Sequence, residues 1–349
     1  MRRAFCCAAF RGAAQWKHQL GETSKMTTQT LTRKQACATQ ATSAMPDGLQ
    51  LRSCGHELNM ASECFGALRD SSDALHDEAA LRERMQNDGY LYLPDYLQRD
   101  EVLQARGVIT KRLAQAGCLD ETFDVDEAVA VRGKGSNFAP DLALANEPLH
   151  RVLYSGRMME FYERLLGEDV RHFDFTWMRA IAPGHGTSPH CDMVYMGRGT
   201  QELYTSWTPL GDTSFAMGGL MILESSHRHQ KLRDNYCRKD VDAFCSNRRA
   251  ADHAKMGGGG NIREGGWLSD NPVKLRQNLG GRWLSSEFRA GDLLAFSTFI
   301  VHASLDNQSK VIRLSSDSRY QRASEPADER WIGANPVGHG PGGKRGMIC

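Results

Sequence analysis

Apolar and polar positions along this chain of 349 residues follow two different spacings, and the change falls near residue 170. Before it, apolar residues recur every three or four positions, as they do on one face of a helix. This spacing predicts helices over 77–88, 99–116 and 148–166, each followed by a glycine that stops it. Between the first two, the apolar run 90–93 closed by a proline predicts a short strand.

After residue 170 the pattern becomes strand-like, with short apolar or alternating runs separated by turn residues. We expect strands within 171–183, 204–210, 219–223, 292–297 and 311–315. Several short strands preceded by helices indicate a mainly β fold with flanking helices. The pattern favours a β-sandwich or jelly roll with a helical layer on one side.

The pattern also divides the chain into segments. Residues 1–75 are predicted to be a disordered extension, 76–331 the folded domain, and the glycine-rich residues 332–349 a flexible tail. Within the domain, the polar stretch 237–278 carries two glycine clusters and interrupts the strands. We interpret it as an insertion that forms either a lid or a surface loop.

The first 44 residues contain seven basic residues and one acidic residue, with serine, threonine, glutamine and alanine between them. This composition fits an organellar, for example mitochondrial, transit peptide. It also fits a disordered tail, or a start assigned too early with Met26 or Met45 as the true first residue. We favour these two readings because the apolar positions form no amphipathic helix.

Composition narrows the classes of partner. With 43 basic and 42 acidic residues the net charge is +1, which favours neither nucleic acid nor an acidic membrane surface as partner. No apolar run reaches the roughly 20 residues that span a bilayer. The ten cysteines are scattered and form no C-x-x-C pair, so we expect free thiols in the cytoplasm or another reducing compartment. Oligomeric state leaves no signal in this pattern.

Candidate chemistry is concentrated in the run Pro189-His190-Cys191-Asp192. In extended chain, residues two positions apart point the same way, so His190 and Asp192 can present an imidazole nitrogen and a carboxylate oxygen to one point. The best third ligand is His302, which follows the apolar run 293–296. Two histidines and one carboxylate leave coordination positions open, as iron(II) oxygenases require.

Arg313, eleven residues after His302, is a lone cation in an apolar strand. Burying a charge is costly unless a partner of opposite sign is present. A guanidinium donates two parallel hydrogen bonds to a carboxylate. We therefore expect Arg313 to bind an anion, for which a dicarboxylic co-substrate is suited.

These residues, in this order, resemble the phytanoyl-CoA dioxygenase family over residues 76–330. The motifs that carry the resemblance are H-C-D at 190–192, W-T-P-L at 207–210, G-G-L at 218–220, S-S-H-R at 225–228, G-D-L-L-A-F at 291–296, H-A-S at 302–304 and V-I-R-L-S at 311–315. The H-x-D motif alone is weak evidence, but the ordered set is specific. One departure is Pro189, where many relatives carry an aromatic residue; we expect it to affect the pocket wall.

The resemblance implies a double-stranded β-helix, cupin-like, with iron(II) held by His190, Asp192 and His302. It implies 2-oxoglutarate as co-substrate, gripped by Arg313, and O₂ as oxidant. Ser304 and Trp207 match positions that line the co-substrate pocket in the family. The implied function is hydroxylation of a C–H bond in a small or medium organic substrate.

Three further residues are candidates for substrate contact: Arg179, Tyr195 and Tyr204. For Arg179 a surface ion pair fits the sequence equally well, and for the tyrosines core packing is the default. Two other functions stay open at this point. One is a catalytically silent binding protein of the same fold, and the other is a metal-dependent hydrolase or isomerase on a cupin-like barrel, which would leave Arg313 unexplained.

Overall fold

The computed structural model describes residues 48–135, 137–245, 266–339 and 345–347. The chain divides into two units, 1–41 and 42–349, and all the described residues belong to the second. The expectations for residues 1–47, including the transit peptide, therefore lie outside the described part. No helix within that part is long and apolar enough to cross a membrane.

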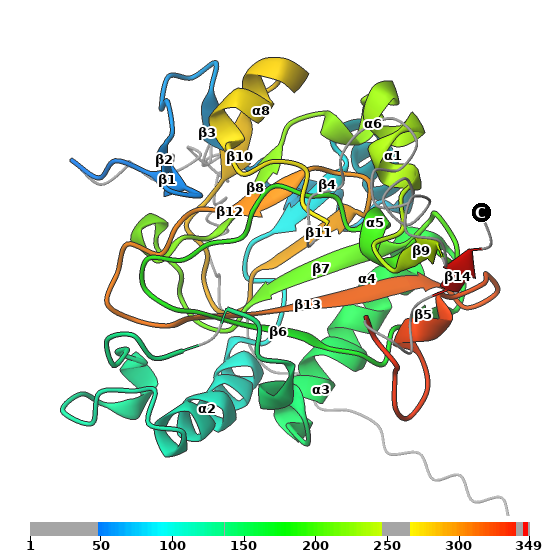
Figure 1. Cartoon of the computed structure of the whole chain (residues 1–349). Helices are drawn as coiled ribbons and strands as arrows, with labels where there is room; N and C mark the ends of the chain where they lie inside the picture. The colour runs from blue at the N-terminus through cyan, green and yellow to red at the C-terminus, as the bar shows by residue number, and fades with distance from the viewer. Residues whose placement is uncertain (1–47, 136, 246–265, 340–344, 348–349) are drawn as a thin grey trace, which may run out of the picture. The chain divides into compact units, whose positions relative to one another are not determined.

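Short strands and helices alternate along the described chain (Figure 1). The strands are β1 Arg52–Ser53, β2 His56–Glu57, β3 Phe65–Ala67, β4 Tyr90–Leu93, β5 Val170–His172, β6 Trp177–Ile181, β7 Tyr204–Pro209, β8 Leu220–Leu223, β9 Ala243–Cys245, β10 Trp283–Ser285, β11 Leu293–Ser297, β12 His302–Ser304, β13 Arg313–Arg322 and β14 Arg345–Met347. The α-helices are α1 Glu78–Asp88, α2 Arg99–Gln115, α3 Glu147–Tyr154, α4 Gly156–Leu166, α5 Met193–Met196, α6 Gln230–Asp234 and α8 Pro272–Leu279. Short 3₁₀ turns include η5 Ser226–Arg228, η6 Tyr236–Arg238 and η7 Glu329–Trp331.

Two sheets form the framework. The larger has the order β4-β11-β7-β13-β5, with β6 also paired to β13, and all its pairs are antiparallel. The smaller has the order β12-β8-β10-β3, in which only β3 is parallel to its neighbour. Apolar side chains from both sheets form one buried cluster between them, including Trp207 and Phe296 from the larger and Ile222 from the smaller. The predicted mainly β fold, a double-stranded β-helix, is confirmed.

The outer face of the larger sheet is covered by helices. Strand β4 shows how the two faces of the larger sheet differ. Leu91 and Leu93 join the cluster shared with helices α1 to α4, whereas Tyr90 and Tyr92 face the smaller sheet. Alternate residues of a strand point to opposite faces, so a strand buried on both sides reads as continuously apolar. Figure 1 shows α2, α3 and α4 lying along this side of the larger sheet.

The helices agree with the predicted spans except in one place. Asp77 caps α1 by accepting hydrogen bonds from two backbone amides, and Gly89 ends this helix with φ +78°. The single helix expected over 148–166 is instead two helices. Ser155 is extended, with φ −150° and ψ 178°, and Gly156 has φ +51°, so the chain turns between α3 and α4.

The predicted boundary at residue 75 was wrong for residues 48–75. Strand β3 pairs with β10, and Leu51, Leu58 and Phe65 are buried in a cluster on the outer face of the smaller sheet. The few apolar residues of this segment are isolated in sequence, so their spacing reveals neither a helix nor a strand.

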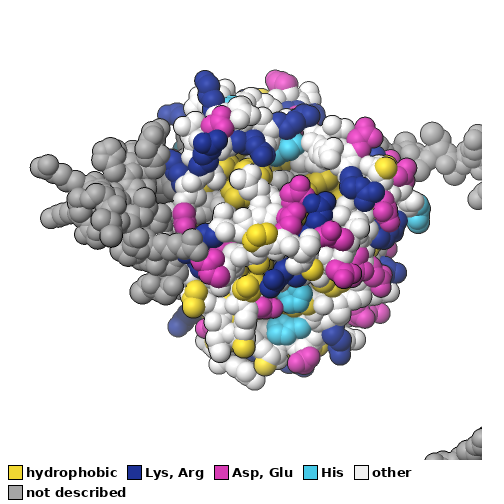
Figure 2. All heavy atoms as spheres, turned by 90° about the vertical axis from the view of Figure 1, so that its right-hand side faces the viewer, with side chains coloured by type: hydrophobic (Ala, Val, Ile, Leu, Met, Phe, Trp, Pro, Cys, Tyr) yellow, Lys and Arg dark blue, Asp and Glu magenta, His cyan; other side chains and the backbone are white. Residues whose placement is uncertain are grey.

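The predicted insertion and tail also contain regular structure in their described parts. Strand β9 lies within 237–278 and helix α8 begins there, and β9 pairs with β14 near the end of the chain. Residues 332–339 make defined contacts: the Gly338 amide donates to the Arg330 carbonyl at 2.9 Å, and the Gly333 amide donates to the Asp174 carboxylate at 2.6 Å. On the face in Figure 2 acidic and basic side chains are interspersed, with apolar side chains and histidines between them.

Candidate metal centre

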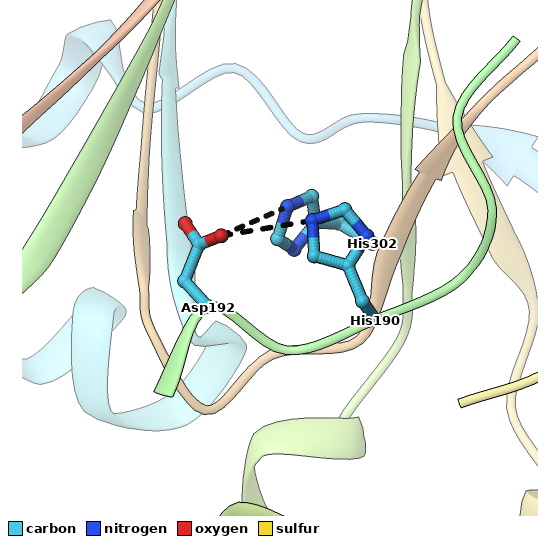
Figure 3. Close-up of side chains that lie close together, drawn as sticks. All are labelled: His190, Asp192 and His302. Carbon is cyan, nitrogen blue, oxygen red and sulfur yellow. Dashed lines mark ion pairs between the residues drawn. The ribbon is translucent and has the colours of Figure 1, made fainter. Parts of the chain in front are cut away.

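His190, Asp192 and His302 converge at one end of the space between the two sheets. His190 and the first residue of β12, His302, form an antiparallel backbone pair with both N···O distances 3.0 Å. Asp192 immediately precedes α5. The Asp192 Oδ1 atom lies 3.6 Å from His190 Nε2 and 3.7 Å from His302 Nε2, and the three ligand atoms all lie within 4.8 Å of one another (Figure 3).

Backbone carbonyl groups orient both imidazoles. His190 Nδ1 lies 2.7 Å from the Ser188 carbonyl oxygen, and His302 Nδ1 lies 3.2 Å from the Ile300 carbonyl oxygen. A carbonyl oxygen only accepts, so each Nδ1 carries the hydrogen and donates it. The lone pair is then on Nε2 in both rings, and Nε2 is the atom directed at Asp192.

Asp192 is buried, and its two oxygens have different surroundings. Oδ2 accepts hydrogen bonds from Thr205 Oγ1 at 2.6 Å and from Arg319 Nη2 at 2.9 Å. Oδ1 therefore faces the two imidazoles. Burial by itself would raise the pKa of Asp192, but the charge of Arg319, with smaller effects of the two imidazoles, outweighs it and holds this pKa well below its usual range.

The protonation states suit metal binding. Burial, followed by the effect of His190, lowers the pKa of His302 to about 4. At neutral pH the site therefore offers a neutral imidazole and an ionised carboxylate, the forms in which these groups coordinate a cation. Two imidazoles and one carboxylate on one side of a cation leave positions open for a co-substrate and O₂, so the donor set fits iron(II).

Thr205 and Arg319 are functional candidates that the sequence analysis missed. A signal was present: Arg313, Asp317 and Arg319 are separated by even numbers of residues on β13, so they share one face of the strand. Thr205 and Trp207 are related in the same way on β7. Because Arg313 was predicted to face the site, the same periodicity would have brought Arg319 there too.

Arg313 is 1% exposed and has no carboxylate partner within hydrogen-bond distance in the described chain. Its Nη1 donates to the Gly218 carbonyl at 2.5 Å, and its guanidinium lies 5.8 Å from the Trp207 ring centroid. Its Nε is buried without a hydrogen-bond partner. Burial lowers the pKa of Arg313 to about 10, against the opposing effect of Asp317. An unsatisfied buried cation of this kind fits the carboxylate of a diacid such as 2-oxoglutarate.

Ser304 and Trp207, the other predicted co-substrate residues, are buried near Arg313 and the ligands. Ser304 Oγ accepts a hydrogen bond from the Thr187 amide at 2.8 Å. Trp207 packs against Phe288 with ring centroids 4.7 Å apart, and the Arg313 guanidinium lies over its ring. Neither side chain lines the open cavity beside the ligands.

That cavity has a volume of about 270 Å³ and opens next to His190 and Asp192. Its lining combines aromatic rings with polar and charged side chains, and most of its surface area is apolar. The lining residues are Phe138, Trp177, Arg179, Thr187, Ser188, His190, Asp192, Tyr195, Met196, Trp267, Arg319 and His339. A mostly apolar cavity with a few placed polar groups is the usual form of a small-molecule site.

Two of the three predicted substrate residues line this cavity. Arg179 pairs with Asp317 through Nε at 2.9 Å and lies over the Phe138 ring. Tyr195 meets His190 edge-on, with ring centroids 5.5 Å apart.

Tyr204 does not reach the cavity, so the prediction for this residue was wrong. It lies on the opposite face of β7 from Thr205 and packs against the cluster beneath the helices. Its neighbour on that face, Ser206, bonds to Tyr162 of α4 at 2.8 Å. The one-residue offset from Thr205 is enough to turn the side chain away from the site.

Comparisons with known proteins agree with this geometry. Residues 85–315 match the family model described as "Phytanoyl-CoA dioxygenase (PhyH)". Two curated relatives are 1-deoxypentalenic acid 11-beta-hydroxylases, each 26% identical. The one from Streptomyces arenae aligns over 75% of this chain and 88% of its own, and the one from Streptomyces exfoliatus over 73% and 85%.

Solved structures show the same fold. The epimerase SnoN, in complex with Fe3+, alpha ketoglutarate and nogalamycin RO, is 18% identical with a TM-score of 0.50, covering 75% of this chain and 93% of its own. The non-heme alpha ketoglutarate dependent carbocyclase SnoK from nogalamycin biosynthesis is 15% identical with a TM-score of 0.51, covering 76% and 88%. The match over 85–315 spans well over half of the chain. The chain belongs to the phytanoyl-CoA dioxygenase family of iron(II)- and 2-oxoglutarate-dependent oxygenases, and it is an oxidoreductase.

Proposed function

We propose that this chain hydroxylates a C–H bond of a small or medium organic acid with an apolar skeleton. The observation that carries the proposal is the convergence of His190, Asp192 and His302 beside a cavity of about 270 Å³ with aromatic walls. These three residues hold iron(II). Arg313 binds one carboxylate of 2-oxoglutarate, above the Trp207 ring and near Ser304.

Iron(II) with 2-oxoglutarate and O₂ supplies the oxidising chemistry, in which 2-oxoglutarate becomes succinate and carbon dioxide while a substrate C–H becomes C–OH. The chain's own residues position the reactants. Thr205 and Arg319 hold Asp192 so that only Oδ1 faces the cation. The unsatisfied guanidinium of Arg313 gains a charge partner when the diacid binds. The aromatic walls orient the substrate and exclude water from the reacting bond.

The charges around the cavity support an acidic substrate. Arg179, Arg313 and Arg319 are three guanidiniums, and Asp192 and Asp317 are the carboxylates paired with two of them. Iron(II) adds two positive charges and 2-oxoglutarate removes two, so one positive charge is left without a partner. A substrate monoanion balances it. Arg179 uses Nε for Asp317 and lines the cavity, so its remaining nitrogens suit a substrate carboxylate. The curated relatives are, by name, hydroxylases of a carboxylic acid.

Succinate release tests the iron and 2-oxoglutarate assignment. Purified full-length protein with iron(II) and ascorbate should convert 2-oxoglutarate to succinate, and Asp192→Ala should lower this by roughly a hundredfold or more because a metal ligand is lost. Arg69→Ala, which breaks an exposed ion pair remote from the site, is the matched control and should behave as wild type. Full turnover by Asp192→Ala would refute the assignment.

A paired panel tests the substrate class. Alicyclic monocarboxylic acids and their methyl esters are compared for stimulation of succinate release. The acids should stimulate more strongly than the esters, and Arg179→Gln should reduce this preference about tenfold or more, because a charge-assisted hydrogen bond is lost. Equal stimulation by acids and esters would contradict the substrate class while leaving the iron and 2-oxoglutarate assignment intact.

A further inference from the structure

The outer wall of the cavity contains a histidine from the part of the chain that sequence analysis predicts to be a flexible tail. His339 lines the cavity together with Tyr195, and their ring centroids lie 5.7 Å apart, edge to face. On another side its ring meets Trp331 edge-on at 4.6 Å. Tyr195 also contacts the metal-site residue His190, so the phenol ring touches both imidazoles.

A carboxylate fixes the orientation of the His339 ring. Nδ1 of His339 lies 2.7 Å from Asp242 Oδ2. Asp242 is 4% exposed and is itself held by Arg330, whose Nη1 donates to Asp242 at 2.6 Å. Arg330 is 1% exposed and also bonds to Asp328 and Asp240. The partner of His339 is therefore part of a buried ionic network and cannot swing away from it.

This arrangement leaves one polar atom of the ring available. Because the Asp242 carboxylate accepts from Nδ1, the other ring nitrogen, Nε2, is the polar atom left to face a ligand. Nε2 has no hydrogen-bond partner within the described chain, and the side chain is 36% exposed, so a ligand in the cavity can reach it. A polar atom held in a fixed direction beside aromatic rings is the kind of group that helps to determine how a substrate is oriented.

We propose that His339 is a substrate-specificity residue whose Nε2 hydrogen-bonds a polar group of the substrate, with Asp242 holding the ring in place. This inference rests on the proposed function, because it concerns the same cavity. Because Nδ1 carries the ring hydrogen, Nε2 accepts, so the inference adds that the substrate carries a hydroxyl within reach of His339 as well as a carboxylate near Arg179. It also makes the segment 332–339 part of the active-site wall.

A purely structural role for His339 is the competing explanation, because its ring packs on Trp331 and Tyr195. Two substitutions separate the explanations. His339→Phe keeps an aromatic ring in the gap but removes the nitrogen, whereas His339→Gln loses ring packing but keeps a hydrogen-bonding group. A packing role predicts that Phe is the better replacement, and a specificity role predicts that Gln is.

The test is calorimetric titration of the full chain, loaded with iron(II) and 2-oxoglutarate without oxygen. The probe is a hydroxylated alicyclic monocarboxylic acid, chosen as the one that most stimulates succinate release by wild type. We expect His339→Phe to weaken probe binding about tenfold, His339→Gln to recover most of the loss, and the affinity for 2-oxoglutarate to stay unchanged. His172→Phe, at an imidazole stacked on Tyr154 outside the cavity, is the matched control and should bind as wild type.

Each other outcome decides against the inference. Equal probe affinity in wild type and His339→Phe overturns it while the proposed function stands. Better binding by His339→Phe than by His339→Gln assigns the residue to packing. If no panel acid stimulates wild type, the substrate class fails and the inference, which describes how that class is bound, fails with it. Succinate release without substrate then shows whether the iron and 2-oxoglutarate assignment survives.

Discussion

Neighbouring groups hold each of the three metal-site side chains so that one of its oxygen or nitrogen atoms can bind the cation. Asp192 has one oxygen bound to Thr205 and Arg319 and the other facing two imidazoles. His190 and His302 each donate Nδ1–H to a carbonyl and keep the Nε2 lone pair. The geometry of the site is therefore set by neighbours that do not themselves bind the cation.

Replacing Arg319 should weaken iron binding. Arg319→Met removes the guanidinium that holds Asp192 Oδ2, so the buried carboxylate loses both its orientation and its charge partner. We expect iron(II) affinity to fall by about 10- to 100-fold in an anaerobic titration against a competing chelator. Thr205→Val, which removes one uncharged donor to the same oxygen, should have a smaller effect. Unchanged affinity in Arg319→Met would show that Asp192 needs no such support.

Arg313 should show opposite effects on stability and ligand binding. Among the described residues no carboxylate lies within hydrogen-bond distance of the buried Arg313, so Arg313→Met should leave the melting temperature of ligand-free protein equal or higher. The same substitution should abolish the rise in melting temperature that 2-oxoglutarate gives the iron-loaded wild type. Differential scanning calorimetry with and without 2-oxoglutarate measures both effects. A full rise in the variant would remove Arg313 from the co-substrate site.

At the scale of elements, the strands of the larger sheet have one face toward the site and the other toward the helices. Some of the helices end at a glycine. On β13, Arg313 and Arg319 face the site, whereas Leu314 and Tyr320 face the helices. Helices α1 and α4 both end in a glycine with positive φ, Gly89 at +78° and Gly167 at +76°. The two glycines share this backbone conformation but differ in the atoms around them, so mutating both separates the effect of the conformation from that of the surroundings.

Gly89→Ala should destabilise the protein more than Gly167→Ala does. Both substitutions place a side chain in the left-handed region, which costs about 1 to 2 kcal/mol. A Cβ at residue 89 would also collide with the ring of His227, which is buried and bonds to the Gln86 carbonyl. At residue 167 the atom nearest to an added Cβ is the end of the flexible Arg82 side chain, at 3.7 Å. We expect roughly 1 to 3 kcal/mol of further loss at residue 89. Urea unfolding of the two variants measures the difference, and equal losses would contradict it.

At the scale of the whole molecule, the segment 48–75 belongs to the folded domain. Leu51, Leu58 and Phe65 cover the outer face of the smaller sheet. Ser53 Oγ donates to the Ser304 carbonyl at 2.8 Å, and the Asp306 carboxylate accepts from the Cys54 and Gly55 amides. The segment is thus attached to the strand that begins with His302.

Removing this segment should destroy the fold's stability. A chain that begins at residue 76 lacks the buried apolar side chains of this segment, Leu51, Leu58 and Phe65 among them. The loss of more than about 5 kcal/mol is comparable to the whole stability of a typical domain. We expect it to bind a hydrophobic dye and to show no cooperative thermal transition, whereas a chain that begins at residue 48 should melt cooperatively. A cooperative transition at the same temperature in both chains would show that the segment is dispensable.

Whether a feature could be predicted from the sequence depends on how far apart along the chain its interacting residues lie. His190, Asp192, His302 and Arg313 could be recognised because their order and spacing are specific. Helix α1 and strand β4 could be placed because their signals are local. Strand β10 and its partner β3 could not, because each is three residues long and is defined by pairing across more than two hundred residues. His339 could not, because its position depends on Asp242 and on packing between distant rings.

The backbone pairing of His190 with His302 has a consequence for how the protein is made. Two of the three cation-binding side chains, His190 and Asp192, are present once residue 192 has left the ribosome. The third, His302, is synthesised much later and then pairs with His190 through two backbone hydrogen bonds. A nascent or prematurely terminated chain that stops before residue 302 therefore lacks the imidazole that completes the set. We expect iron to be acquired only after nearly the whole polypeptide has been synthesised, so that the redox-active ion is first held by a chain able to enclose it.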